Sequence, residues 1–111
     1  MMKDMNMALS GAKAKILKAL AHQTRLYMVE ELAKGERCVC EFVEAVGSDF
    51  STVSKHLLIL KDAGIVQVDK RGQKVFYSLK VPCITNFLGC IETVIKSNLE
   101  EQNLMFRGIL K

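Results

Sequence analysis

The sequence predicts a mainly α-helical fold with one β-hairpin, an α+β chain in which helices dominate. Most segments repeat apolar residues at helical spacing, whereas residues 65–68 and 75–79 are β-prone and flank a polar, turn-rich loop. Glycines separate the segments at intervals typical of short helices, at Gly35, Gly47, Gly64 and Gly72. A length of 111 residues supports one compact core, so we expect a single domain over residues 1–111.

Four helical segments precede the hairpin. Residues 4–20 place apolar side chains at helical spacing and predict an amphipathic helix. Residues 23–33 predict a second helix that stops before Gly35, and residues 39–46 predict a short third helix that Gly47 ends. Residues 48–51 are rich in N-cap residue types and predict the start of a fourth helix, over residues 51–63.

A long last helix is expected over residues 82–106, because proline is well tolerated in a first helical turn and Pro82 stands there. It carries two adjacent apolar stripes, one led by Ile84 and the other by Phe87. One small subunit cannot bury an apolar band this wide on its last helix. We therefore predict a homodimer through residues 4–20 and 82–106. The alternative is that this helix packs inside its own chain.

The order of these elements contains a helix-turn-helix motif followed by a wing. Residues 47–49 form the turn, and the helix after it is predicted to enter the major groove of double-stranded DNA. Hydroxyls and amides near its N-terminus suit phosphates, a lysine adds charge, and a histidine offers a donor or acceptor to base edges. The predicted contacts are Ser51, Thr52, Ser54, Lys55 and His56. The alternative is an ordinary capped helix, with His56 packed against the hairpin or the dimer contacts.

The loop of the hairpin is basic. Lys70, Arg71 and Lys74 lie at its tip. There they would contact phosphates or the minor groove, beside the helix that is predicted to enter the major groove. The net charge of +4 fits a nucleic-acid partner, although many proteins without one are as basic. We predict DNA binding through residues 48–63, and a two-fold dimer implies an operator that is an imperfect inverted repeat.

Three stretches of this sequence resemble the ArsR/SmtB family of bacterial metal-responsive repressors. Ala-Leu-Ala-His-Gln-Thr-Arg-Leu at residues 19–26 is similar to the opening of the family's second helix. Residues 51–66 resemble its recognition helix with the strand after it, and residues 71–79 resemble its wing. Gln23 stands where the family usually has proline, which should affect only the helix start. The resemblance implies a winged helix-turn-helix homodimer that represses its operator when ligand-free and leaves DNA when ligand binds.

Two cysteines begin the short third helix. Cys38-Val39-Cys40-Glu41 is similar to the Cys-Val-Cys-Asp motif of the arsenic, cadmium and lead sensors of that family. Arsenite and soft metal ions prefer thiolates, and a helix N-terminus favours the thiolate form. Side chains two positions apart point to nearly opposite sides of a regular helix, so both bind one ion only where the first turn is not helical. The alternative is that these cysteines are small apolar packing residues.

The source of a third ligand is less defined. Arsenic sensors with this motif often carry another cysteine three positions further along, where this chain has Val43. Cys83 and Cys90 lie about 10 Å apart along the last helix, so at most one of them joins the pair. We predict Cys83, from either subunit, and expect Cys90 to be a packing residue. Residues 82–111 contain no histidine, which disfavours the family's zinc site on the last helix.

The function predicted from these observations is a DNA-binding repressor that releases its operator when Cys38, Cys40 and Cys83 bind arsenite, cadmium or lead, with no permanent cofactor. The alternative is a redox or reactive-sulfur sensor that bridges Cys38 or Cys40 to Cys83 or Cys90. An enzyme is disfavoured, because nothing near the pair supplies a general base or a phosphate-binding glycine loop. A winged helix used only for protein contacts would show no salt-dependent DNA binding. Without a signal sequence or an apolar run of about 20 residues, we expect a cytoplasmic protein with no membrane partner.

Overall fold

A computed structural model describes the backbone of residues 2–110 and, apart from residues 2, 3, 106, 109 and 110, their side chains. The helices and strands follow one another as α1 (Met2–Leu20), α2 (Gln23–Leu32), β1 (Arg37–Cys38), α3 (Val39–Val46), α4 (Phe50–Asp62), β2 (Val66–Arg71), β3 (Lys74–Leu79) and α5 (Ile84–Leu110). The predicted class, mainly helical with one hairpin, is confirmed.

The strands form an antiparallel sheet in the order β1-β3-β2. The strand β1 was not predicted, because two residues carry no measurable periodicity; it exists through pairing, with Arg37 opposite Tyr77 and Cys38 opposite Phe76. The hairpin is also longer than predicted. Its strands continue through the polar loop to the pair Arg71 and Lys74. Only Gly72 and Gln73 remain as the turn, in which Gly72 takes the positive φ of 62° that short hairpin turns require.

The core lies between α2, α3, α4 and the start of β2. Phe42 and Met28 are its largest fully buried side chains. Val53, Leu57 and Leu60 repeat at helical spacing along α4, and all three are fully buried. Because one face of α4 is anchored in this way, its opposite face is held on the surface.

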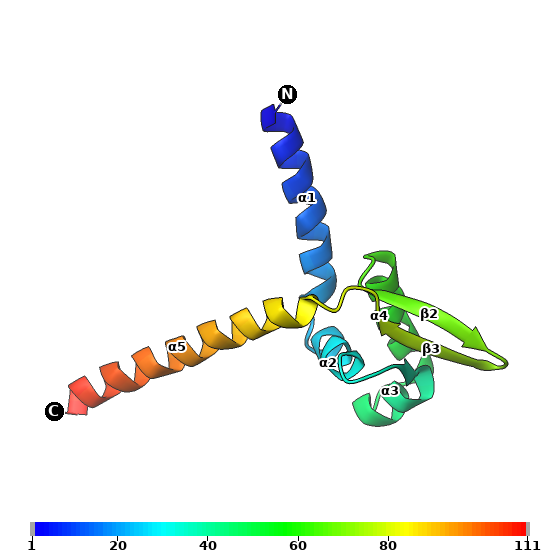
Figure 1. Cartoon of the computed structure of the whole chain (residues 1–111). Helices are drawn as coiled ribbons and strands as arrows, with labels where there is room; N and C mark the ends of the chain where they lie inside the picture. The colour runs from blue at the N-terminus through cyan, green and yellow to red at the C-terminus, as the bar shows by residue number, and fades with distance from the viewer. Residues whose placement is uncertain (1, 111) are drawn as a thin grey trace.

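The two terminal helices extend away from this body in different directions (Figure 1). Among the described residues their inner ends join the core, α1 through Ala19 and Leu20 and α5 through Leu88, with Ile84 packed beside it. Further along, α5 exposes Ile91, Val94, Ile95 and Leu99, so the alternative of an intramolecular core helix is wrong. The helix begins at Ile84 rather than at Pro82, which forms the turn before it, and it continues past residue 106. No helix in the described part of the chain has the length and apolar character that crossing a membrane requires.

Candidate DNA-binding surface and cysteine pair

The turn of the helix-turn-helix motif is built by two caps. Gly47 ends α3 in the left-handed conformation, with φ of 74° and ψ of 15°. Asp49 begins α4, and its Oδ1 accepts a hydrogen bond of 2.8 Å from the backbone N–H of Thr52. Hydrogen bonding from Thr52 holds the pKa of Asp49 below its ordinary value. These caps fix the N-terminal end of α4 on the surface.

Most of the predicted helix contacts lie on that end of α4. Ser51, Thr52 and Lys55 are exposed there, and Ser54 is half-buried. Exposed hydroxyls and a lysine near the start of a helix suit an anionic backbone. Their contact with DNA stays a prediction.

His56 instead faces the body of the protein. Its ring lies 4.5 Å from the ring of His22, centroid to centroid, and its Nδ1 lies 3.2 Å from Nη1 of Arg25. Burial, followed by the positive charges of His22 and Arg25, holds the pKa of His56 below 6.5. A neutral ring accepts the Arg25 hydrogen bond at Nδ1. His56 therefore joins α4 to α2, rather than packing on the hairpin as the sequence alternative suggested.

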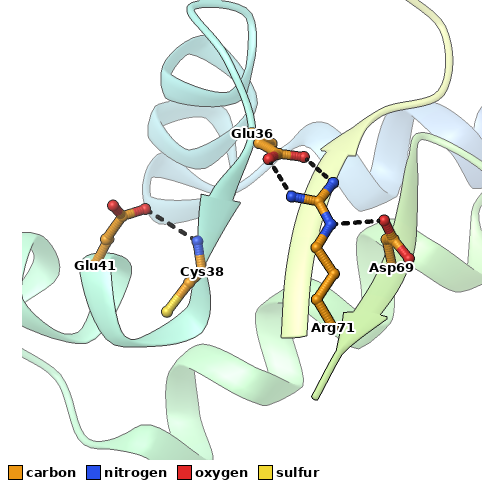
Figure 2. A network of polar contacts seen from close by, with 5 residues as sticks. All are labelled: Glu36, Cys38, Glu41, Asp69 and Arg71. Carbon is orange, nitrogen blue, oxygen red and sulfur yellow. Dashed lines mark hydrogen bonds and ion pairs between the residues drawn. The ribbon is translucent and has the colours of Figure 1, made fainter. Parts of the chain in front are cut away.

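The basic residues of the wing divide into two kinds. Lys70 and Lys74 are exposed and form no ion pair within the described residues. Arg71 lies in a polar network (Figure 2). Its Nη1 and Nη2 donate to the two carboxylate oxygens of Glu36 at 2.6 and 2.8 Å, and its Nε donates to Oδ2 of Asp69 at 2.9 Å. Glu36 and Asp69 raise the pKa of Arg71, and Arg71 lowers that of Glu36.

The two cysteines of the motif meet at the start of α3. Cys38 is extended, with φ of −86° and ψ of 156°, and acts as the N-cap, so the first turn is not regular helix at this position. Its Sγ accepts from the N–H of Cys40 at 3.3 Å. Figure 2 shows the other half of this capping box, in which Oε2 of Glu41 accepts from the N–H of Cys38 at 2.9 Å. Cys38 and Cys40 are joined as a disulfide. The two sulfurs therefore lie together at a first turn that is not regular helix, which is the arrangement that the sequence analysis required of a shared site.

The pair borders a cavity of about 250 Å³ between the start of α4 and the wing. Phe50, the first residue of α4, lines the cavity together with Gln73, Lys74 and Val75 of the hairpin. A ligand on the sulfurs would therefore meet both predicted DNA-binding elements.

The cysteines of the C-terminal region lie elsewhere. Cys83, just before α5, is exposed and lines a different cavity, of about 400 Å³, with Leu17 and Phe87. Cys90, expected to pack, is also exposed in the single chain. Among the described residues no three His, Cys, Asp or Glu side chains are placed to hold a metal, so one subunit alone does not bring Cys83 to the pair. The disulfide also differs from the predicted bridge, because it joins Cys38 to Cys40.

Sequence analysis missed the carboxylates around Arg71 and the cap at Cys38. Glu36 is 35 positions from Arg71 in the chain, and no local pattern signals such a pair. Asp69 was visible as the acidic residue in a basic loop. The capping box was also readable, since Glu41 stands three positions after Cys38.

Comparison with known proteins agrees with this arrangement. Residues 22–68 match the family described as bacterial regulatory protein, arsR family. The cadmium resistance transcriptional regulatory protein CadC homolog of Staphylococcus aureus is 42% identical over 67 residues, which are 60% of this chain and 55% of the relative. The arsenic resistance transcriptional regulator ArsR1 of Pseudomonas putida is 40% identical over 65 residues, 58% of this chain and 51% of the relative. The chain thus spans about half the length of these curated relatives.

A solved structure extends the likeness to most of the chain. The homodimeric winged helix-turn-helix DNA-binding domain of Mb0332 from Mycobacterium bovis, a possible ArsR-family transcriptional regulator, was determined by solution NMR. It matches with a TM-score of 0.77 and 31% identity, over 88% of this chain and 91% of that one. Fold and site together define a winged helix-turn-helix regulator of the kind that binds DNA. The chain belongs to the ArsR family of bacterial transcriptional regulators.

Proposed function

We propose that this protein is a homodimeric repressor that leaves its operator when the thiolates of Cys38 and Cys40 bind arsenite or a soft metal ion, cadmium or lead. One observation carries the proposal: the two sulfurs meet at the first turn of α3, beside a cavity lined by both α4 and the wing. The names of the cadmium and arsenic regulators among the relatives support it.

The chemistry begins with the reduced pair, since a disulfide offers no thiolate. Each thiol loses its proton when its sulfur binds the ion as a thiolate. The third position on the ion falls to Cys83 of a partner subunit or to a water-derived oxygen. No permanent cofactor takes part, and no catalytic step is involved.

The expected switch is mechanical. The Sγ of Cys38 is the acceptor that caps α3, and an ion on this sulfur competes for the same lone pairs. The far end of α3 leads through residues 47–49 directly into α4. A shift of the first turn of α3 therefore moves the helix that reads DNA, and the ion-bound form is expected to hold the operator less tightly.

The remaining parts of the proposal concern assembly and context. The exposed apolar faces of α1 and α5 would pair across a two-fold axis, so that two α4 helices meet the halves of an imperfect inverted repeat. Residues 1–111 would act as one domain in the cytoplasm, where the thiols stay reduced.

The test is fluorescence anisotropy of a labelled duplex from the region upstream of the gene, under strong reductant, during titration with arsenite, cadmium and lead. Wild type is expected to release DNA, while Cys38→Ser and Cys40→Ser stay bound. Cys83→Ser reports on the third ligand, and Cys90→Ser is the matched control. Tight DNA binding that none of the three ions weakens would reject the metal-sensing proposal.

A redox sensor is the second candidate, and the Cys38–Cys40 disulfide favours it. Two thiols would lose two electrons and two protons to an oxidant such as a peroxide, which becomes water. DNA release by peroxide without reductant, reversed by added dithiol and matched by the loss of two thiols per chain, would support this candidate. An arsenite response under strong reductant would favour the first.

A further inference from the structure

Arg71 was predicted to contact DNA, but its side chain is fixed by contacts within the protein. Three of its five N–H donors are occupied by carboxylates, two of them by Glu36 in a bidentate pair. The guanidinium carbon also lies 4.7 Å from the centroid of the Phe76 ring. Planar carboxylate pairing and aromatic stacking are the two interactions in which lysine does not replace arginine.

The charge around Arg71 is unfavourable for a phosphate. Two carboxylates surround one guanidinium, so the group has a net charge of −1. A phosphate that displaced Glu36 would leave that carboxylate uncompensated close to the DNA backbone. Lys70 and Lys74, with no ion pair among the described residues, can meet phosphate without breaking an ion pair of that kind.

Two of the residues that contact Arg71 lie next to Cys38, one along the chain and one across the sheet. Glu36 lies directly before β1, two positions from Cys38. Phe76, under the guanidinium, is the backbone partner of Cys38 in the sheet. Arg71 therefore ties the end of the hairpin to the segment on which a ligand would act (Figure 2).

We infer that Arg71 is a positioning residue that ties the wing to the cysteine-bearing strand, and that it does not bind phosphate. The wing then moves with β1, and a change at Cys38 reaches DNA through the wing as well as through α4. The transmission of an inducer signal rests on the proposed function, whereas the tie itself does not.

The first experiment measures operator affinity by anisotropy, without any ion, for Arg71→Lys, Arg71→Gln and Glu36→Gln. If Arg71 ties the wing to β1, the bidentate pair of Arg71 with Glu36 is required. All three variants should therefore bind the operator more weakly than wild type. Because the pair is exposed by about half, the loss should be about fivefold at most. Glu44→Gln, which removes an exposed carboxylate of α3 that enters no ion pair among the described residues, is the charge control.

A phosphate contact predicts the opposite pattern. Arg71→Lys would then bind like wild type, and Glu36→Gln would bind more tightly than Glu44→Gln because it frees the guanidinium. Salt dependence gives an independent measure. Lys70→Gln should reduce the slope of log affinity against log salt by about 0.9 per subunit. Arg71→Gln should leave that slope unchanged, and a reduction equal to that of Lys70→Gln would overturn the inference.

The second experiment measures the ratio of operator affinities without and with the inducing ion. Arg71→Lys should show a smaller ratio than wild type, by up to about fivefold, whereas Lys70→Gln should keep the wild-type ratio. An unchanged ratio in Arg71→Lys would show that the tie transmits nothing. If wild type itself releases no DNA, the proposed function fails, and the tie is judged by the ion-free measurements alone.

Discussion

At the scale of single residues, Asp49 decides how firmly the reading helix begins. Asp49→Ala should lower the urea midpoint of unfolding, because the N–H of Thr52 loses its acceptor. Asp49→Asn keeps an acceptor oxygen and should stay close to wild type at neutral pH. The pKa of Asp49 is depressed, so its ionic contribution is complete above an ordinary pKa of about 4 and is lost as pH falls below it. Equal midpoints for the alanine and asparagine variants would show that the cap contributes nothing.

His56 makes the stability of the fold depend on pH nearer to neutrality than Asp49 does. Its pKa is lower in the folded chain than the ordinary 6.5, so the unfolded chain takes up more protons as pH falls through that value. The contribution of the neutral His56 ring to the free energy of unfolding is therefore complete above pH 6.5 and decreases toward acid. Urea midpoints at about pH 7.5 and about pH 5.5 should differ more for wild type than for His56→Gln. The same difference in both proteins would assign the effect to other groups.

At the scale of elements, the turn between α3 and α4 depends on Gly47. Its φ of 74° is unfavourable for any residue with a Cβ, although no atom lies within 4 Å of the position a Cβ would take. Gly47→Ala should therefore cost about 1–2 kcal/mol through the backbone alone. Gly11→Ala, inside α1 and equally uncrowded, should stabilise by roughly 0.5–1 kcal/mol. Urea denaturation of both variants measures the contrast, and a Gly47→Ala protein as stable as wild type would contradict it.

The elements also show which features of the fold can be predicted from the sequence and which cannot. The α4 helix was predictable because Val53, Leu57 and Leu60 repeat at helical spacing beside strong caps. The strand β1 and the contact of Glu36 with Arg71 were not, because both arise from pairing across distant parts of the chain. His56 was ambiguous for a related reason. Its contacts are with His22 and Arg25 at the start of α2. The spacing of residues along α4 does not reveal contacts with another helix.

At the scale of the whole molecule, the terminal helices are expected to hold two chains together. Val94 and Ile95 are 57% and 54% exposed in the single chain. Replacing both with Glu should give a monomer in sedimentation equilibrium and lower operator affinity by about 100-fold, since two linked reading helices gain from each other's binding. Lys96→Glu, at an exposed position away from this face of α5, changes the charge by the same amount and is the control. A double variant that stays dimeric would exclude this face as the interface.

The separation of α1 and α5 from the body has a consequence for how such a regulator diversifies (Figure 1). In the proposed dimer, the helices that extend outward set the distance between the two half-sites, and α4 sets which bases each half-site contains. In the described part of the chain, α1 and α5 join the core through a few residues at their inner ends. In that dimer, operator spacing and operator sequence would be separable traits. Substitutions along the outer part of α5 would retune the first, and exchanges at Ser51, Thr52 and Lys55 the second, each without the other.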